Sequence, residues 1–540
     1  LRTVRELALA PDGKTIAYML CDPREVTGTL LPEDGCSIWE RELDGGEARK
    51  LTRAGAYGLS WSPDGRTLAF YSHEGAEGLR LKLWDRKART ERQVSDATIG
   101  GFVTGTQPAI WSAGGRTIIT KLVPENGVHQ PLANVAEQPS WRRQSIRTES
   151  ASIQYTPAVR SRDQTAAQPY WAKSDLATID VQTGRAQRLT RDLEVYGYLL
   201  SPDGKHVAYM VNTGQLSEQV STWPWSLHVL NLHSGASREL ARDIHQYHGD
   251  SFAWSPDGKF IAYYSGAAWM GGFPSGRERR AALGIAALDG SVARVFEGFG
   301  DFSADAGNAP FWSPDGRFVF AAGAMTLWRA GVADRALQSF VTSDVFSFVN
   351  PLRDGERAWF DCDGSFYAQA TNYETGRSTL LRVNSSGALE PVRESDINLR
   401  SLFARAQRIP ESDTFVLASG SADHSEDIWS VDVRRGRTQQ LTRLNPELDG
   451  YRFGTSKLIS YRSLDGTRLR SALLLPADYR PGKRYPLLVT LYPGSRGSRL
   501  VNQFGFGYGG MDNMQMLSTR GYAVLSPDVP LELGSTAEDI

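Results

Sequence analysis

The chain has 540 residues, of which 41% are hydrophobic and 22% are charged, and its formal net charge is −1. A near-neutral chain lacks the basic face that nucleic-acid binding requires, and no apolar run approaches the roughly 20 residues that cross a bilayer, so composition argues against nucleic-acid and membrane partners. A chain of this length can bury a large core and is expected to contain more than one domain.

The most regular feature is a turn of the Ser-Pro-Asp-Gly type, followed at once by a short apolar strand. Six copies begin at Ala10, Trp61, Trp111, Leu200, Trp254 and Trp312, and two degenerate copies begin at Leu352 and Glu411. Proline presets φ at the first turn position and glycine supplies the positive φ of a tight reversal, so each copy predicts a β-hairpin. Most copies lie ~40 to 60 residues apart, which is near the top of the range for propeller repeats and leaves room for long loops between strands.

A second hairpin signal follows each turn. The clearest is DIWSVDVRRGRTQQLT from Asp427, where alternating apolar residues lead into a glycine-containing turn and a strand that ends on Leu-Thr. Two hairpins supply the four strands of one propeller blade. The sequence therefore predicts a mostly-β fold with an eight-bladed β-propeller in residues 1–442, or a seven-bladed one if the degenerate turns do not mark separate blades.

The three cysteines, Cys21, Cys36 and Cys362, form an odd and sparse set that rules out a disulfide-stapled scaffold. Cys21 and Cys36 flank one loop of the first blade, and two free thiols are favoured over a bond between them. The chain opens at Leu1 on a strand signal without a recognisable targeting segment. The sequence therefore predicts a soluble protein but does not distinguish a cytoplasmic from an exported one.

One repeat is stretched by a polar segment, residues 123–173. A loop of this length without periodicity is usually functional or disordered, so we expect either a substrate-facing insertion or a solvated excursion. Glu125, Arg142 and Arg143 in this segment are candidates for binding a peptide terminus. Solvated surface positions are the simpler interpretation for all three.

Past Thr442 the propeller turns stop and a different pattern begins. Five elements are predicted there: alternating strands at 458–461 and 468–475, a continuous apolar strand at 486–492, a helix at 511–519 and a second apolar strand at 521–527. Alternating strands suit an exposed antiparallel edge, whereas a continuous apolar strand suits burial on both faces. The strand–helix–strand order predicts that residues 451–540 begin an α/β domain.

A propeller that runs into a strand, a DGTRL turn and the segment LPADYRPGKRYPLLV resembles the prolyl oligopeptidase (S9) family of serine peptidases, especially its dipeptidyl-peptidase and acylaminoacyl-peptidase-like branches. The resemblance covers essentially the whole chain, and residues 458–528 carry its most specific part. It implies that the C-terminal region is the N-terminal part of an α/β-hydrolase domain, whose serine attacks a peptide carbonyl.

The same resemblance implies a role for Tyr492. The family places an oxyanion-hole tyrosine in a Tyr-x-Gly-type motif at the end of this strand, and the matching text is Leu491-Tyr492-Pro493-Gly494-Ser495. A phenol there can donate a hydrogen bond to the oxygen on which charge develops. The alternative is a strand-end tyrosine that packs its ring and exposes its hydroxyl. Many relatives carry His-Gly-Gly-Pro here, so Pro493 is a departure.

The chain lacks the Gly-x-Ser-x-Gly nucleophile elbow of α/β-hydrolases, and its last histidine is His424, within the propeller region. A hydrolase domain that starts near Tyr451 would have only ~90 residues before Ile540, fewer than a typical domain. By the family pattern, the nucleophilic serine, the aspartate and the histidine are expected beyond Ile540. The chain is therefore expected to be an inactive piece of a longer protein.

Three other sets of residues have simpler explanations than function. Ser495 and Ser498 lie in a glycine-rich loop without a base nearby in the sequence. Residues 504–510, FGFGYGG, match Gly-x-Gly-x-x-Gly but do not directly follow a strand, as a dinucleotide site requires. His245 and His248 have no apparent third metal ligand. We therefore expect no metal and no cofactor.

The residues and the resemblance together predict a serine-type peptidase that hydrolyses oligopeptides through an acyl-serine intermediate, with the propeller restricting substrate size. Two alternatives remain open: a propeller scaffold that only binds proteins, and an esterase or other acyl hydrolase of the same layout. The sequence does not separate peptide from ester substrates. It also leaves the residue preference and the oligomeric state undetermined.

Overall fold

The computed structural model describes the larger part of the chain, in several ranges of residues. They are residues 1–26, 35–53, 55–73, 78–100, 108–125, 174–214, 223–246, 249–265, 281–299, 309–323, 325–334, 336–395, 398–399, 404–464, 466–491, 496–506 and 513–529. Within these ranges no helix has the length and apolar character needed to cross a membrane.

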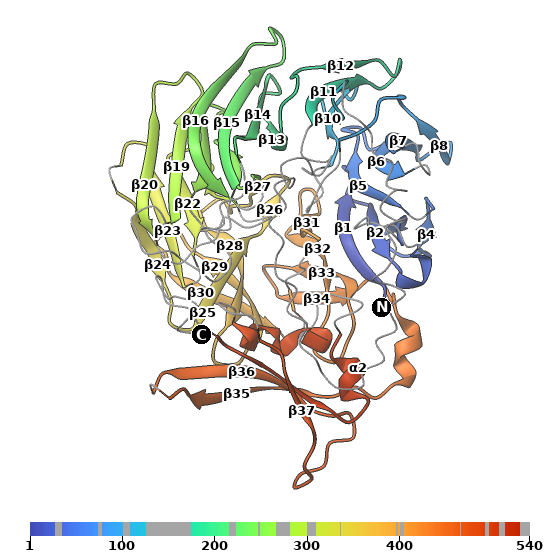
Figure 1. Cartoon of the computed structure of the whole chain (residues 1–540), viewed down its shortest axis with the longest axis vertical. Helices are drawn as coiled ribbons and strands as arrows, with labels where there is room; N and C mark the ends of the chain where they lie inside the picture. The colour runs from blue at the N-terminus through green and yellow to red at the C-terminus, as the bar shows by residue number, and fades with distance from the viewer. Residues whose placement is uncertain are drawn as a thin grey trace, which may run out of the picture.

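Eight four-stranded antiparallel sheets follow one another along the described chain up to Gln440, each an up-and-down meander (Figure 1). The first four sheets consist of β1 (Thr3–Leu9), β2 (Thr15–Cys21), β3 (Cys36–Glu42) and β4 (Arg49–Lys50); β5 (Ala56–Trp61), β6 (Thr67–His73), β7 (Leu79–Asp85) and β8 (Thr90–Gln93); β9 (Ile110–Trp111), β10 (Thr117–Leu122), β11 (Asp175–Asp180) and β12 (Ala186–Arg188); β13 (Val195–Leu200), β14 (His206–Asn212), β15 (Trp223–Asn231) and β16 (Ser237–Gln246).

The fifth to eighth sheets have the same construction. They consist of β17 (Phe252–Trp254), β18 (Phe260–Ser265), β19 (Ala281–Ala287) and β20 (Ala293–Phe299); β21 (Phe311–Trp312), β22 (Phe318–Ala322), β23 (Thr326–Gly331) and β24 (Gln338–Thr342); β25 (Phe346–Pro351), β28 (Phe366–Asn372), β29 (Ser378–Val383) and β30 (Leu389–Ser395); β31 (Gln407–Arg408), β32 (Thr414–Ser419), β33 (Asp427–Asp432) and β34 (Arg437–Gln440). Repeated four-stranded sheets of this kind are consistent with a β-propeller.

The repeated turn joins the first two strands of a sheet, as predicted. In the second sheet Ser62 Oγ donates to Asp64 Oδ1 at 2.6 Å, the Thr67 amide donates to Ser62 Oγ at 3.0 Å, and Gly65 has a φ of 67°. The same Ser–Asp hydrogen bond closes the turns at Ser201, Ser255 and Ser313. The serine and aspartate thus satisfy polar groups of the turn itself, while glycine adopts the left-handed conformation.

In four of the sheets the tryptophan that precedes the turn donates a hydrogen bond to the sheet before it, a role that we did not predict. Trp61 Nε1 donates to the Ala8 carbonyl at 3.0 Å, and Trp312 Nε1 donates to the Ala253 carbonyl at 3.2 Å. Equivalent hydrogen bonds run from Trp111 to Ser60 and from Trp254 to Leu199. A buried indole N–H needs a partner, so the motif fixes the stacking of sheets as well as the hairpin.

The first and eighth sheets pack against each other, so the succession of sheets closes on itself (Figure 1). The shared core includes Val4 and Tyr18 from the first sheet and Val416 and Ile428 from the eighth. Hydrophobic contact therefore joins parts of the chain that are about 400 residues apart, and burial of these apolar side chains stabilises the closure.

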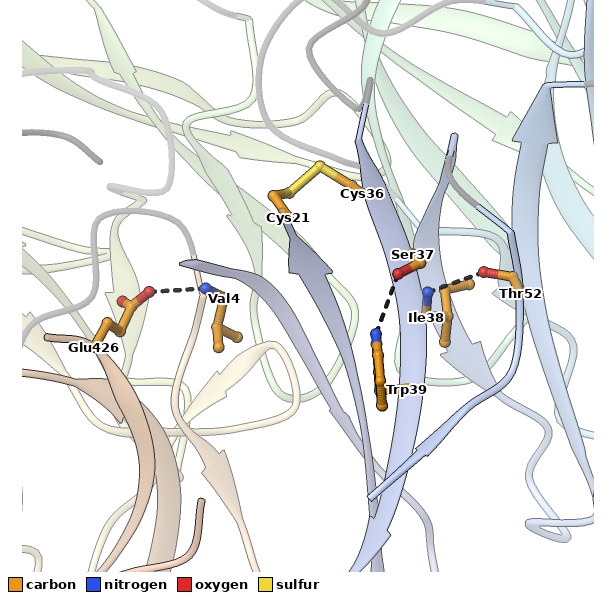
Figure 2. Close-up of a disulfide and its surroundings, with 8 residues drawn as sticks. All are labelled: Val4, Cys21, Cys36, Ser37, Ile38, Trp39, Thr52 and Glu426. Atoms are coloured by element: carbon orange, nitrogen blue, oxygen red, sulfur yellow. Dashed lines mark hydrogen bonds between the residues drawn. A yellow bond between two sulfur atoms is a disulfide. The ribbon is translucent and has the colours of Figure 1, made fainter. Parts of the chain in front are cut away.

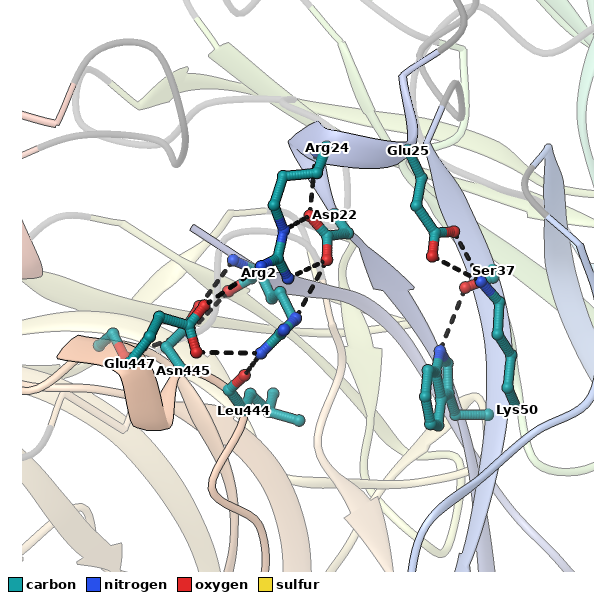
Figure 3. A network of polar contacts seen from close by, with 11 residues as sticks. Arg2, Asp22, Arg24, Glu25, Ser37, Lys50, Leu444, Asn445 and Glu447 are labelled. Atoms are coloured by element: carbon teal, nitrogen blue, oxygen red, sulfur yellow. Dashed lines mark hydrogen bonds and ion pairs between the residues drawn. The ribbon is translucent and has the colours of Figure 1, made fainter. Parts of the chain in front are cut away.

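Polar contacts around Arg2 reinforce this closure (Figure 3). The Arg2 amide donates to Asn445 Oδ1 at 2.8 Å, and Asn445 Nδ2 donates back to the Arg2 carbonyl at 3.0 Å. The Arg2 guanidinium also contacts Asp22 at 3.1 Å and Glu447 at 3.3 Å. Hydrogen bonds from Arg24 and Arg2 hold the pKa of the Asp22 carboxyl well below its usual value, so Asp22 is charged over the whole physiological range.

Cys21 and Cys36 form a disulfide (Figure 2), so our preference for two free thiols was wrong. Cys21 ends β2, Cys36 begins β3, and the two are direct partners in the antiparallel register. Strand pairing therefore brings together two sulfurs that are 15 residues apart in the sequence. Cys362 is free and exposed.

The degenerate copy at Leu352 does not form the turn of the seventh sheet. Its residues form a separate two-stranded hairpin, β26 (Arg353–Asp354) and β27 (Arg357–Ala358). The Arg353 guanidinium donates to the carbonyls of Glu356 and Ala309, both at 3.0 Å, which ties the hairpin to residues just before β21. The turn that precedes β28 lies between Asp361 and Gly364 instead. The copy at Glu411 does precede β32, as predicted.

A further four-stranded sheet follows the propeller-like part and lies at one end of it (Figure 1). Its order is β35-β36-β38-β37, and its strands are β35 (Ser456–Arg462), β36 (Arg468–Leu474), β37 (Leu487–Val489) and β38 (Ala523–Pro527). The short helices among the described residues are η1 (Pro23–Glu25), η4 (Pro446–Gly450), η5 (Gly497–Asn502), η6 (Phe504–Phe506) and α2 (Gln515–Ser518). Only β37 and β38 pair in parallel within this sheet, and α2 lies between them in sequence, as the strand–helix–strand pattern predicted.

The apolar sequence of β37 led us to expect that this strand is covered on both faces, but it is not. Leu487, Leu488 and Val489 are 54%, 38% and 49% exposed, whereas Val524 on β38 is fully buried. The core of this sheet is formed by Ala472, Leu474, Val501, Phe506 and Val524. Within the described chain, β37 has a neighbouring strand on one side only and no layer packs over it.

Candidate active site

The carboxyl ends of β37 and β38 form the candidate active site. The two strands pair in parallel, with Leu488 opposite Val524 and Val489 opposite Leu525, so both strands end at the same edge of the sheet. The Thr490 amide extends the pairing by donating to the Leu525 carbonyl at 2.9 Å. In open α/β sheets this edge is where ligands bind.

Tyr492, the predicted oxyanion donor, follows Leu491 in the sequence but lies outside the described residues, together with Pro493, Gly494 and Ser495. Its role therefore stays a prediction. Ser498 is described and is buried, and its backbone amide donates to Asp528 Oδ1 at 2.9 Å. Within the described chain no hydrogen bond joins the Ser498 hydroxyl to a base, in keeping with a structural position.

Asp528 stands at the end of β38 and was not singled out from the sequence. Its carboxylate accepts the Ser498 amide, its own amide donates to the Arg470 carbonyl at 2.8 Å, and its backbone pairs with Arg496 in an isolated bridge. Gly497 lies so close to β38 that a Cβ there would be 2.5 Å from the Pro527 carbonyl oxygen. Segment 496–498 is therefore fixed tightly against the carboxyl end of β38.

The opposite side of this segment contacts the seventh propeller sheet. The Arg496 guanidinium donates to the Tyr373 hydroxyl and lies 5.1 Å from the Tyr373 ring centre. Arg499 Nη2 donates to Ser347 Oγ at 2.7 Å, and Asn502 Nδ2 donates to the Gly376 carbonyl at 2.7 Å. The candidate site thus lies where the C-terminal sheet meets β25 and the turn after β28.

A second contact joins the same two parts of the molecule through Gln515, at the start of α2. Gln515 is buried, and its Nε2 donates to the carbonyls of Ala422 and Gly454, both at 3.0 Å. Its Oε1 accepts the Gly454 amide at 2.9 Å. One side chain therefore connects α2, the linker before β35 and a loop of the eighth sheet.

Of the remaining candidates, only Glu125, His245 and residues 504–506 are described. Glu125 is exposed and pairs with Arg188 at 3.4 Å and with Arg191 at 3.3 Å, so it is a surface position. Arg142, Arg143 and His248 lie outside the described residues, as do residues 507–510 of the glycine-rich segment. Within the described ranges, no group of three or more His, Cys, Asp or Glu residues is placed to hold a metal ion.

Comparison with known proteins gives relatives that share this layout, although no family model matches the chain. The chain is 22% identical to dipeptidyl-peptidase 5 of Porphyromonas gingivalis, over 98% of this chain and 66% of that protein. Among solved structures, dipeptidyl peptidase 4 of Porphyromonas gingivalis aligns with a TM-score of 0.59 and 11% identity, over 97% of this chain and 71% of that one.

An acylaminoacyl peptidase of Pyrococcus horikoshii aligns with a TM-score of 0.53 and 12% identity, over 100% of this chain and 66% of that one. At these identities the solved structures show a shared fold. The chain spans slightly less than two thirds of the length of the curated dipeptidyl-peptidase.

Proposed function

Because this chain is related to the peptidases of the prolyl oligopeptidase (S9) family, we propose that it forms the larger part of a serine peptidase that hydrolyses oligopeptides. The reaction would proceed through an acyl-serine intermediate, with a histidine as base and an aspartate that orients it. The observation that carries this proposal is the parallel pair β37–β38, beside whose carboxyl edge Arg496 contacts the seventh propeller sheet. This chemistry requires no metal and no organic cofactor.

We propose the architecture of an eight-bladed propeller in residues 1–442 and the first part of an α/β-hydrolase domain in residues 451–540. The eight successive sheets and the packing of the first against the eighth support the propeller. Its placement beside the candidate site would restrict access to short peptides. A matched pair of substrates, the same sequence as a free peptide and within a folded protein, tests this, because only the free peptide should be cleaved.

The nucleophile, acid and base are proposed to lie beyond Ile540. The exposed leucines and valine of β37 support this, because an apolar strand of a sheet is stable when further strands or helices cover it. The absence of a nucleophile elbow from the sequence is in keeping with the same interpretation. On this proposal the chain itself is inactive and the full-length protein is active.

Tyr492 is the proposed donor to the tetrahedral oxyanion. It follows the carboxyl end of β37 directly after Leu491, which is where a charge-stabilising group would meet the reacting carbonyl. Replacing Tyr492 with Phe in the full-length protein should lower kcat by about 100-fold while KM changes little, because the lost hydrogen bond forms only as charge develops. An unchanged kcat would remove Tyr492 from the mechanism.

Two other functions make different predictions in the same assay. A protein-binding scaffold would hydrolyse neither peptide amides nor esters. An esterase of the same layout would cleave an acyl ester and leave the matching peptide p-nitroanilide intact. Steady-state hydrolysis of both substrates by the full-length protein therefore separates the three, and a peptidase is expected to cleave the peptide p-nitroanilide.

A further inference from the structure

We propose that Arg496 and Tyr373 form a positioning pair, through which the seventh propeller sheet fixes residues 496–502, which follow Tyr492 in the sequence, at the carboxyl end of β38. This inference rests on the proposed peptidase function, because it gives the pair a role toward the proposed oxyanion donor. Both residues act through the backbone that they hold and not on the substrate itself.

The described chain is held at two points of this edge, Thr490 and Arg496. On the N-terminal side, the Thr490 amide donates to the Leu525 carbonyl at 2.9 Å, which continues the parallel pairing of β37 with β38. On the C-terminal side, Arg496 bridges to Asp528 through its backbone and to Tyr373 through its side chain. Arg496 is therefore held by the C-terminal sheet and by the propeller at the same time.

Tyr373 is well placed to serve as the fixed partner. It follows β28 directly, and its amide donates to the Val345 carbonyl at 2.7 Å, which ties it to the residue just before β25. The turn after it is closed by the Gly376 amide, which donates to the Asn372 carbonyl at 2.8 Å. A group supported by rigid backbone on both sides can hold a second group in one position.

Arg496 contacts both the hydroxyl and the aromatic ring of Tyr373. Its guanidinium donates to the hydroxyl and also lies 5.1 Å from the ring centre, so hydrogen bonding and cation–π attraction act together. The Arg470 guanidinium, from β36, lies 5.9 Å from the same ring. One propeller side chain therefore contacts arginines from two different segments of the C-terminal sheet.

Close packing beside the pair limits any sliding of η5 over the propeller. A Cβ on Gly376 would lie 2.4 Å from Val501 Cγ1, so the turn and η5 approach as closely as glycine allows. Asn502 Nδ2 adds a hydrogen bond to the Gly376 carbonyl at 2.7 Å. The propeller turn at residues 372–377 therefore sets the position of residues 496–502.

The test compares Tyr373→Phe and Arg496→Ala in the full-length protein. Tyr373→Phe removes only the hydroxyl that accepts from Arg496 and leaves the ring in place. Both variants should lower kcat for a peptide p-nitroanilide by about tenfold with KM within about twofold, because a small misplacement of a reacting group lowers the rate of the chemical step. The double variant should fall no further than Arg496→Ala alone, since both changes remove one interaction.

Matched controls separate positioning from general loss of structure. Tyr461→Phe alters a partly exposed tyrosine of β35, and Arg86→Ala removes an ion pair between the first two sheets, at 2.7 Å from Asp12. Neither control should change kcat. If Tyr373→Phe and Arg496→Ala both retain the wild-type kcat, or if the controls lower kcat equally, the positioning role is wrong.

Hydrogen exchange gives a readout that does not depend on activity. In Tyr373→Phe, peptides that cover residues 486–502 should exchange faster than in the wild type, while peptides from β35 and β36 should not change. A wild-type protein without any hydrolase activity would contradict the proposed function, and the exchange result would still decide whether the pair holds this segment. Unchanged exchange in 486–502 would overturn the inference.

Discussion

Strands β32 and β37 contain the same kind of residues but differ completely in burial. In β32, Phe415 and Val416 are fully buried between neighbouring sheets, whereas in β37 Leu487 is 54% exposed and Val489 is 49% exposed. The propeller-like part surrounds each of its middle strands with other strands and with the adjacent sheets. An apolar strand sequence therefore predicts that the strand is stable only when it is buried. Whether it is buried depends on the strands and helices that pack against it.

The largest expected effect comes from truncating the side chain of one buried leucine and comparing the loss of stability with that of one exposed leucine. In the 540-residue chain, Leu417→Ala should lower the free energy of unfolding by about 3 kcal/mol, because it leaves a cavity in a closed core. Leu488→Ala should change it by less than about 0.5 kcal/mol, because this side chain is 38% exposed. Urea unfolding of both variants measures the difference.

The same two variants in the full-length protein test whether β37 is covered there. On our proposal Leu488→Ala should then cost about 2 kcal/mol or more, close to the effect of Leu417→Ala. If Leu488→Ala remains neutral in the full-length protein, the apolar face of β37 has no cover and the proposed hydrolase sheet is wrong.

A smaller expected effect is a difference between a buried and an exposed lysine in how they change the pH dependence of folding stability. Burial lowers the pKa of Lys121, on β10, to about 7, although its ammonium donates to the Tyr196 carbonyl at 3.0 Å. The unfolded chain has a lysine pKa near 10.4, so between about pH 7 and pH 10 the unfolded state binds the extra proton. Folding stability should therefore rise with pH across this window and stay flat for this group below pH 7.

Comparison of Lys121→Met with Lys483→Met isolates this effect. The free energy of unfolding of the wild type should increase by about 1 kcal/mol or more from pH 7 to pH 9 relative to Lys121→Met. Lys483 is exposed in the C-terminal region, so Lys483→Met should retain the wild-type pH dependence. The same slope in all three proteins would contradict a depressed pKa for Lys121.

Local signals in the sequence predicted much of the fold. Proline, aspartate and glycine at fixed offsets located the hairpins at Ser62 and Ser255, because turn chemistry depends on adjacent residues. The degenerate copy at Leu352 misled us because RDGE does form a turn, but in a separate hairpin. The Cys21–Cys36 pair was missed because nothing in the spacing reveals strand register.

The candidate site was predictable only in part. The apolar strand before Tyr492 and the strand that ends near Asp528 were both found, and their parallel pairing follows from the helix between them. The contact of Arg496 with Tyr373 was not found, because it joins residues 123 positions apart without a local pattern. Long-range contacts of this kind follow from how the sheets pack, which single-residue signals do not specify.

The most direct test of the central claim is labelling with a fluorophosphonate, which reacts with activated serines, followed by mapping of the modified residue. Our account predicts that the full-length protein is labelled at one serine beyond Ile540 and that the 540-residue chain is not labelled. Labelling of a serine within residues 1–540, or no labelling of the full-length protein, would contradict the account.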